Sequence, residues 1–329
     1  MACALTIGNF DGVHLGHRAL VGRCVELAQG DGLEVVAVTF DPPPVALLKP
    51  EAVPPQLVPV DERVGRLERA GADRVAVVTP TAELLAQSPE RYVEALVAEH
   101  GPRHVVTGPD FRFGKDRRGD VAMLARLGES HGFAAHVVED VRVELSQGLA
   151  APCRSTLIRH LVGHARFDDA ARCLGEPFAL TATVVRGERR GRTIGFPTAN
   201  LSADELAGLM LPPDGVYACV ARVGLPGGQG GTIAVPAAVS IGPKPTFDGQ
   251  RVTVEAHLID PPAELMPDAD ALYGRAMTLA FHQHLRDQQR FPSLDALVAQ
   301  LGRDVAHTRS LRSDDTLATA AASAASRPA

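Results

Sequence analysis

The sequence has few cysteines, and their spacing suits neither a zinc site nor a disulfide framework. Its five cysteines, among 329 residues, are scattered, odd in number and never arranged as C-x-x-C. Small disulfide-rich domains and zinc-binding domains both depend on regularly spaced cysteines. We therefore expect reduced thiols, which are typical of a cytoplasmic protein.

Long hydrophobic runs are also missing. No window reaches the roughly 18 apolar residues that a membrane-spanning helix needs. The first residues, MACALTIGNFDGVH, lack the basic stretch and apolar run of a secretory signal. We expect no membrane partner and a chain that begins almost directly with folded structure.

An excess of basic charge is absent as well. The sequence has 33 Lys and Arg against 39 Asp and Glu, which gives a net charge of −6. Proteins that bind nucleic acid or acidic membranes generally carry the opposite balance. We expect no nucleic-acid partner, and any anionic ligand has to be held by a few local cations.

The length and composition are those of two soluble, folded domains. Hydrophobic residues make up 45% of the chain and charged residues 22%, whereas disordered chains are less apolar. At roughly 150 residues per domain, the chain is long enough for two separate cores. The sequence does not predict an oligomeric state.

Up to about residue 175, short Val-rich runs alternate with longer segments of helical spacing. This alternation is typical of βαβ units and predicts a doubly wound, Rossmann-like parallel sheet. The expected strands are Cys3–Gly8, Leu33–Phe40, Arg74–Val78, His104–Gly108 and Ala134–Val141. The expected helices are Leu15–Gln29, Asp61–Ala70, Pro89–Glu99 and Val121–His131, followed by a short helical pair at 155–163 and 167–174.

From about Phe178 the pattern changes to strands separated by loops rich in Gly and Pro. It predicts an antiparallel β-barrel closed by one helix, Ser293–Leu301, with the segment LPGGQGG at 225–231 as a hairpin connection. We expect domains at 1–175 and 178–305 and a disordered tail at 306–329. The expected strands are Phe178–Val185, Val216–Val223, Thr232–Ser240, Arg251–Ile259 and Met277–Phe281.

The most informative segment of the first domain is GNFDGVHLGH at 8–17, between the first strand and the first helix. Glycines at such a turn let the backbone approach a ligand, and the new helix presents free N–H groups to an anion. His14 and His17 are three residues apart and would lie on the same side of the first turn. There they could bind phosphate and stabilise the negative charge that develops in phosphoryl or nucleotidyl transfer. Taken alone, the segment is also compatible with an incidental helix start.

The second domain has a loop at 186–200, RGERRGRTIGFPTAN, that could wrap a phosphate. Thr198 and Asn200 alternate on one extended face and offer oxygen ligands suited to Mg²⁺. Glu255 lies in the middle of an expected strand, where a carboxylate could act as a general base. Taken alone, arginine-rich stretches are more often solvated loops, and strand carboxylates more often face solvent.

The first domain resembles the N-terminal module of the bacterial bifunctional riboflavin kinase/FAD synthetases, and GNFDGVHLGH resembles the H-x-G-H signature of nucleotidyltransferases. Further matching segments follow in order: TFDPPP at 39–44, SPERYV at 88–93, VVTGPDFRFGKDRRGD at 105–120 and RSTLIR at 154–159. The resemblance implies that His14 and His17 bind the ATP phosphates and are catalytic. It implies ATP-binding roles for Gly8, Asn9, Phe10, Asp11, Gly12, His14, Gly16, His17, Ser155, Thr156 and Arg159, and flavin-binding roles for Asp110, Phe111, Phe113 and Gly114.

The second domain resembles the riboflavin kinase module of the same family through GRTIGFPTANL and VTVEAHLID. The resemblance implies that Glu255 is the catalytic base and that Thr198 and Asn200 hold Mg²⁺. The ATP-binding residues that it implies are Gly191, Arg192, Thr193, Gly195, Phe196, Pro197, Thr198 and Asn200.

Four residues depart from the family pattern. Pro43 stands where the family usually has His, and Arg154 where it usually has the first Ser of S-S-T. Ser240 stands where Asn is frequent, and Gln288 where Glu is common. The first two lie in the nucleotidyltransferase segments and the other two in the kinase segments.

The resemblance implies a cytoplasmic bifunctional transferase whose small-molecule substrates are riboflavin, FMN and ATP, with Mg²⁺ as cofactor. The kinase domain would convert riboflavin to FMN, and the first domain would convert FMN to FAD and release pyrophosphate. One alternative is a specialised paralogue that keeps only the kinase or acts on a modified flavin. The other is a non-catalytic flavin or nucleotide sensor, although the residues expected for catalysis are all present.

Overall fold

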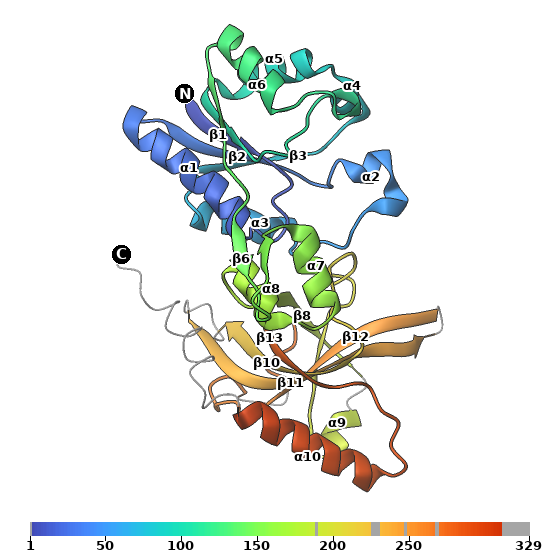
Figure 1. Ribbon diagram of the computed structural model, residues 1–329. Coiled ribbons are helices and arrows are strands. Elements are labelled where there is room, and N and C mark those ends of the chain that lie inside the picture. Colours follow the sequence, from blue (N-terminus) through green and yellow to red (C-terminus); the bar gives the residue numbers. More distant parts are fainter. Residues whose placement is uncertain (1, 188–189, 225–230, 247–248, 267–269, 311–329) are drawn as a thin grey trace. The chain divides into compact units, whose positions relative to one another are not determined.

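The chain forms two compact units in the computed structural model, which describes residues 2–187, 190–224, 231–246, 249–266 and 270–310 (Figure 1). The first unit consists of residues 1–158 and 173–175, and the second of residues 159–172 and 176–329. The helical pair expected in the first domain therefore belongs largely to the second unit. The functional boundaries 1–175 and 178–305 stay a prediction.

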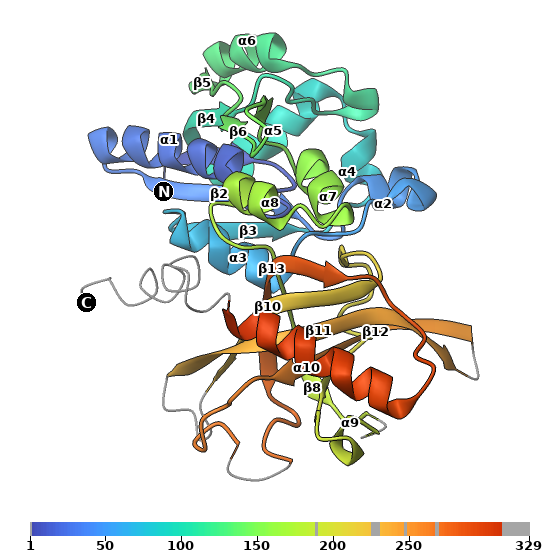
Figure 2. The ribbon, with the colours of Figure 1, turned by 60° about the horizontal axis from the view of Figure 1, so that its bottom comes forward.

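The first unit is a five-stranded parallel sheet with helices on both faces (Figure 2). The strand order is β3-β2-β1-β4-β5, and every neighbouring pair is parallel. This confirms the predicted doubly wound sheet. The strands are β1 (Cys3–Ile7), β2 (Glu34–Phe40), β3 (Arg74–Val78), β4 (Pro102–Thr107) and β5 (Ala134–Val137).

The helices of this unit begin and end at local signals. Ser88 caps the start of α5 through a hydrogen bond from the Arg91 N–H, and Asp120 caps α6 in the same way. Gly101 and Gly132 end these two helices in the left-handed conformation. The helices are α1 (Leu15–Asp31), α2 (Val45–Leu48), α3 (Val60–Arg69), α4 (Ala82–Ala86), α5 (Pro89–His100) and α6 (Val121–His131), with 3₁₀ turns η1 (Pro50–Ala52) and η2 (Lys115–Arg117).

The alternation of side chains along β1 builds a core on each face of the sheet. Leu5 and Ile7 pack in one cluster with residues of α5 and α6, whereas Ala4 packs in the other with residues of α1 and α3. A parallel strand covered on both faces is mostly apolar, and β1 is buried throughout, with Thr6 as its polar residue. The short elements α2 and α4 escaped the sequence analysis because one helical turn is too short to show a period.

The strand order reverses between β1 and β4. Ligands of open α/β sheets bind at such a reversal, beyond the carboxyl ends of the strands. The loop at 8–14 leaves β1 at this point, and the loop at 108–114 leaves β4 there. Beyond β5 the expected strand Ala134–Val141 was wrong in its second half, because the strand ends at Val137 and a small antiparallel pair follows, β6 (Arg142–Glu144) with β7 (Ala150–Pro152).

The second unit is a closed barrel in the order β10-β11-β12-β9-β8-β13, and all of its pairings are antiparallel. This confirms the predicted barrel. Its strands are β8 (Ala179–Val185), β9 (Ala199–Leu201), β10 (Gly215–Gly224), β11 (Thr232–Thr246), β12 (Gly249–Leu258) and β13 (Ala276–Arg286). Its helices are most of α7 (Ser155–Gly163), α8 (Phe167–Leu174), the short α9 (Arg190–Thr193) and α10 (Leu294–Ser310).

Helix α10 is attached to the barrel by a buried ion pair. The Arg286 Nη2 lies 2.8 Å from Asp304 Oδ2; Asp304 is buried, with its side chain 4% exposed, and Arg286 is partly buried, with 12% exposed. The helix continues to Ser310, so the expected helix end at Leu301 and the expected start of the tail at residue 306 were wrong. Residues 311–329 and most of the expected hairpin connection at 225–231 lie outside the described residues.

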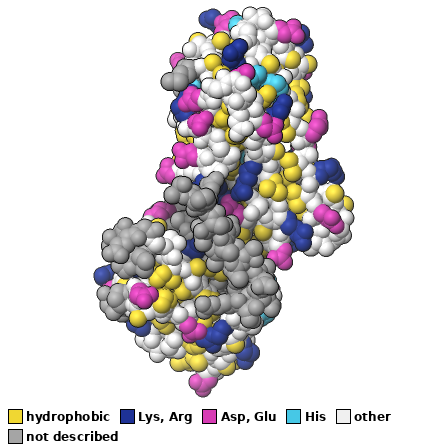
Figure 3. Space-filling view, turned by 90° about the vertical axis from the view of Figure 1, so that its left-hand side faces the viewer, with side chains coloured by type: hydrophobic (Ala, Val, Ile, Leu, Met, Phe, Trp, Pro, Cys, Tyr) yellow, Lys and Arg dark blue, Asp and Glu magenta, His cyan; other side chains and the backbone are white. Residues whose placement is uncertain are grey.

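In the described ranges, no helix is both long and apolar enough to span a bilayer. On the face of the first unit that Figure 3 shows, acidic and basic side chains are interspersed. A large patch of one charge sign is not visible on that face.

Candidate active sites

The turn between β1 and α1 is held in a strained conformation by packing. Phe10 and Val13 both have positive φ, 48° and 43°, which costs free energy in residues with a side chain. The Phe10 ring is buried beneath Gly8, where an added Cβ would lie 3.3 Å from the ring. At Gly12, with φ 86°, a Cβ would lie 2.8 Å from Leu57. The turn therefore brings backbone close to the carboxyl end of β1.

Asp11 braces this turn. Its carboxylate accepts hydrogen bonds from the Leu57 N–H at 2.8 Å and the Val58 N–H at 3.4 Å. Its backbone oxygen accepts a bond from the Ser155 hydroxyl at 2.8 Å. Asp11 therefore ties the turn to two other segments, one of which is the start of α7.

His14 and His17 come together at the start of α1, on the same side of its first turn. Their rings stack with centroids 3.6 Å apart, and the His14 Nδ1 accepts a hydrogen bond from the His17 N–H at 3.4 Å. Gly16 permits this approach, because a Cβ there would lie 3.1 Å from the Cys153 oxygen and from the His14 ring. The start of α7 thus packs directly against the two histidines.

His17 is neutral at physiological pH. Burial, the adjacent His14 and the Arg63 guanidinium lower the pKa of His17 well below its ordinary value. Its Nδ1 is buried without a hydrogen-bond partner in the described part of the chain. The ring can therefore supply a hydrogen bond to a ligand, while a positive charge at this site has to come from elsewhere.

A buried arginine that the sequence analysis missed supplies that charge. Arg63 of α3 is 2% exposed, and its Nη1 donates to the Phe40 oxygen at 2.8 Å. Its Nη2 donates to Gln56 Oε1 at 3.0 Å. Three residues on, Arg66 donates to the Gly12 oxygen at 3.3 Å. The signal in the sequence was two arginines on the core-facing side of an amphipathic helix, where charged residues are rare unless they have partners.

Arg154 bridges two carboxylates at the start of α7. Its Nη1 lies 3.1 Å from Asp110 Oδ2, and its Nη2 lies 2.6 Å from Asp140 Oδ2. The adjacent Thr156 is exposed and Arg159 is half-buried, on the same helix. The departure from the family pattern at Arg154 therefore introduces a cation that connects α7 to the loop after β4.

The predicted flavin residues form an aromatic cluster after β4. Phe113 is buried and stacks on Phe111 at 5.6 Å, and its ring lies 5.7 Å from that of Tyr92. Gly114 has φ 69°, and a Cβ there would lie 2.7 Å from the Pro89 nitrogen. The loop therefore packs tightly against the first turn of α5.

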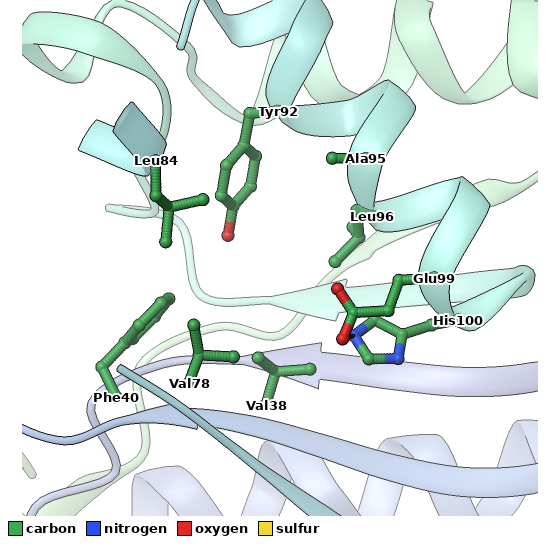
Figure 4. Close-up of a pocket in the computed structure, with 9 residues that line it drawn as sticks. All are labelled: Val38, Phe40, Val78, Leu84, Tyr92, Ala95, Leu96, Glu99 and His100. Carbon is green, nitrogen blue, oxygen red and sulfur yellow. Dashed lines mark ion pairs between the residues drawn. The ribbon is translucent and has the colours of Figure 1, made fainter. Parts of the chain in front are cut away.

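Tyr92 also lines an open cavity between α4, α5 and the ends of β2 and β3. Figure 4 shows the Tyr92 hydroxyl pointing into this cavity from α5, with Leu84 beside it and Phe40 opposite. Burial raises the pKa of Tyr92 to about 12, which keeps the phenol protonated. No sequence signal marks Tyr92 as a binding residue, although it lies in the SPERYV segment at 88–93. The lining residues are Val38, Phe40, Val78, Leu84, Tyr92, Ala95, Leu96, Glu99 and His100.

In the barrel, the predicted base and metal ligands lie together. The Thr198 hydroxyl donates to Glu255 Oε2 at 3.1 Å, and Glu255 of β12 is paired directly with Asn200 of β9. Paired residues of antiparallel strands have their side chains on the same face. An added Cβ at Gly187 would clash with the Asn200 amide, so a larger residue there would displace that side chain.

The loop before β9 folds back on itself at the predicted ATP residues. The Phe196 N–H donates to the Gly191 oxygen at 2.9 Å, and Gly195 has φ 84°. Arg192 lies 3.7 Å from Asp270, and Pro197 accepts a bond from the His257 ring at 2.8 Å. Thr193 ends α9 within this loop. In the described ranges no group of three or more His, Cys, Asp or Glu residues could hold a metal ion.

Comparisons with known proteins match two successive segments of the chain to two different families. Residues 1–148 match the family model described as FAD synthetase, and residues 174–312 match the one described as riboflavin kinase. The bifunctional riboflavin kinase/FMN adenylyltransferase of Escherichia coli (strain K12) is 35% identical over 303 residues, which is 92% of this chain and 90% of that protein. The protein of the same description from Pseudomonas fluorescens is 35% identical over 311 residues, 94% of this chain and 93% of that protein.

A solved structure is similar over almost the whole chain. It is described as a macrolide-efflux protein from Streptococcus pneumoniae, is 28% identical and has a TM-score of 0.77. The match covers 94% of each chain. Both folds seen here therefore recur together in one solved protein.

Proposed function

The chain belongs to the family of bifunctional riboflavin kinases/FMN adenylyltransferases, and from this membership we propose which of its residues perform the two reactions. It is a transferase that phosphorylates riboflavin to FMN with ATP and adenylylates FMN to FAD with a second ATP. One observation carries the assignment: each compact unit has its own cluster of the expected catalytic side chains.

In the barrel, Glu255 acts as general base. It takes the proton of the riboflavin 5′-hydroxyl, the oxygen attacks the γ-phosphorus of ATP, and ADP leaves. The bond from Thr198 to Glu255 Oε2 supports this role, because it fixes the carboxylate beside the loop at 186–200. We assign the ATP site to that loop.

The oxygens of Thr198 and Asn200 suit Mg²⁺, a cation that prefers oxygen ligands and few protein contacts. The tight packing of Gly187 against the Asn200 amide supports this fit, because it holds that side chain in place. When bound, Mg²⁺ supplies charge neutralisation on the ATP phosphates. Thr198 and Asn200 hold their oxygens on the side of Glu255 that faces the loop.

In the first unit, the FMN phosphate attacks the α-phosphorus of ATP, and pyrophosphate leaves. The phosphate is already a nucleophile at neutral pH, so positioning and charge stabilisation are sufficient. His14 and His17 hydrogen-bond the phosphates at the start of α1, whose free N–H groups favour anions. Because His17 is neutral, the buried Arg63 contributes the positive charge behind the turn.

The flavin ring of FMN binds at the aromatic cluster of Phe111, Phe113 and Tyr92. Flat aromatic side chains favour stacking on a planar ring system. The open cavity beside Tyr92 supports this assignment, because most of its lining is apolar and the protonated phenol, with Glu99 and His100, offers polar groups to orient a ligand. Asp110 and Gly114 shape the same loop.

The cell compartment of the reactions is also part of this proposal. All five cysteines are free and buried, which supports the reducing cytoplasm. We assign residues 1–175 to adenylyl transfer and 178–305 to phosphorylation.

A product assay tests the proposal. The protein is incubated with riboflavin, ATP and Mg²⁺, and the flavins are separated by chromatography. We expect FMN followed by FAD. Accumulation of FMN without FAD would support the kinase-only paralogue instead, and the absence of both products would support the sensor.

Two variants test the residue roles in the same assay. Glu255→Gln is expected to lower FMN formation by about 10²-fold or more while FAD formation from supplied FMN stays normal. His17→Ala is expected to lower FAD formation by about 10²-fold while FMN formation stays normal. Each reaction is the control for the other, and an equal loss of both activities in either variant would contradict the separation of the sites.

A further inference from the structure

Two of the residues that depart from the family pattern are hydrogen-bonded to each other. The Gln288 Nε2, in the segment after β13, donates to the Ser240 Oγ of β11 at 2.9 Å. The same nitrogen donates to the Ile241 oxygen at 3.0 Å. Gln288 lies close over the strand, since a Cβ added at Gly242 would be 3.1 Å from its Nε2.

This pair lies beside the proposed base. Ser240 is paired directly with Glu255 across β11 and β12, and Glu255 is paired with Asn200 across β12 and β9. Residues in such register share one face of the sheet. Asn200, Glu255, Ser240 and Gln288 therefore form a polar row, in that order.

The order of the row separates the two substrates. Asn200 and Thr198, the proposed metal ligands, lie on one side of Glu255, which places the ATP phosphates there. The accepting hydroxyl has to meet both Glu255 and the γ-phosphorus, so riboflavin approaches from the other side of the base. That side is formed by Ser240 and Gln288.

The hydrogen-bond polarity of the pair is specific. The Gln288 amide has to direct its NH₂ group towards Ser240 and Ile241, because its oxygen would otherwise face a backbone carbonyl oxygen. A carboxylate at position 288 has no proton to donate to that carbonyl. An Asn at position 240 would give that carboxylate one donor from its NH₂ group, which offsets part of the unfavourable contact with the Ile241 oxygen.

We propose that Ser240 and Gln288 are a matched pair of positioning residues that forms the riboflavin side of the kinase site and determines its affinity for riboflavin. This inference rests on the proposed role of Glu255. Neither residue is proposed to take part in proton transfer. Their function is to keep an uncharged wall of fixed geometry next to the base.

The test is a double-mutant cycle with Ser240→Asn, Gln288→Glu and the double variant, using the full chain and steady-state kinase kinetics. Each single change is expected to raise KM for riboflavin about tenfold, with KM for ATP within about twofold of the parent. The double variant is expected to return to within about threefold of the parent. Urea unfolding followed by circular dichroism is the control for folding of the barrel, and FAD formation from supplied FMN, which belongs to the other unit, stays unchanged.

Three results would overturn the pair. In the first, the increases in KM for riboflavin multiply in the double variant. In the second, the single variants keep the KM for riboflavin of the parent. In the third, KM for ATP changes as much as KM for riboflavin. If Gln288→Glu fails to fold, the cycle of Ser240→Ala and Gln288→Ala replaces it, and the second truncation is expected to add little to the first. Failure of the proposed function gives a different result: Glu255→Gln would then keep normal kinase activity, whatever the cycle shows.

Discussion

At the scale of single residues, the two sites depend on side chains whose charge state is set by their surroundings. His17 is held neutral by burial and by Arg63, and Tyr92 is held protonated by burial. Each then acts as a hydrogen-bonding group of fixed protonation state across the physiological pH range. The positive charge needed for anionic substrates comes from arginines, which stay ionised.

Arg154 provides a prediction at this scale. Removing its guanidinium leaves Asp110 and Asp140 without the cation that bridges them, and their charges then oppose anionic FMN and ATP. We expect Arg154→Ser to raise KM for FMN about three- to tenfold in adenylyl transfer, with the effect shrinking in high salt because these groups are partly exposed. Kinase kinetics should not change.

The matched control for this prediction is Arg142→Ser. Arg142 carries the same charge nearby in sequence and is exposed, where it donates to the Ala150 backbone oxygen at 2.7 Å. Steady-state assays at low and high salt compare the two variants. Equal effects of both changes would show that Arg154 acts through net charge alone.

At the scale of elements, α10 shows how one ion pair holds a helix to the barrel. The Asp304 side chain is 4% exposed, and its Oδ2 accepts a hydrogen bond from the Arg286 Nη2 at 2.8 Å. Its Oδ1 accepts a hydrogen bond from Gln300 at 2.8 Å. Asp304 is buried and Arg286 is mostly covered, so the loss of one partner leaves the other charge unpaired in a poorly solvated position. The helix is therefore attached by a contact that no local signal in its own sequence specifies.

Asp304→Ala is expected to lower the unfolding free energy of the barrel by about 3 to 5 kcal/mol. Urea unfolding followed by circular dichroism measures it, which suits a chain without Trp. The control is Arg309→Ala, whose partner Asp260 is 64% exposed. Exposed pairs contribute about 1 kcal/mol or less, so equal losses in the two variants would contradict the buried anchor.

At the scale of the whole molecule, each unit contains a histidine that resists protonation, which is buried in the first unit and half-buried in the second. Burial lowers the pKa of His100 in the first unit and of His282 in the second. One ring nitrogen of each is buried without a partner in the described chain: Nδ1 of His100 and Nε2 of His282. The folded state of each unit therefore binds fewer protons than its unfolded state in mildly acidic solution.

We expect both units to lose stability as the pH falls below about 6.5, the ordinary histidine pKa. Above that pH both states are neutral at these rings and the contribution is zero. Below that pH the unfolded chain takes up protons that the folded chain does not. Each ring therefore lowers the free energy of unfolding by up to about 1.4 kcal/mol for each pH unit. Urea unfolding between pH 7.5 and 5.5 measures how steeply the free energy of unfolding changes with pH. We expect His282→Gln to make this slope shallower for the barrel. An unchanged slope in that variant would contradict the assignment.

The strand and helix pattern was largely predictable from the sequence because its signals are local. Apolar alternation predicted the parallel sheet, and helical spacing predicted the starts of α1, α5 and α6 to the residue. The GNFDGVHLGH and GRTIGFPTAN segments led to the site residues because glycines, histidines and oxygen ligands stand close together in each. The end of α10 was missed because polar residues of its last turns, Asp304 and Thr308, are buried, and Asp304 is held by Arg286, 18 residues earlier.

The sequence by itself determined the two folds, the family and most candidate site residues, since these follow from periodicity and short motifs. Only the tertiary structure decided which residues support those sites. Arg63 reaches Phe40, 23 residues earlier, and Gln288 reaches Ser240, 48 residues earlier. Such contacts arise from strand register and burial, which bring distant residues together without leaving a pattern along the chain.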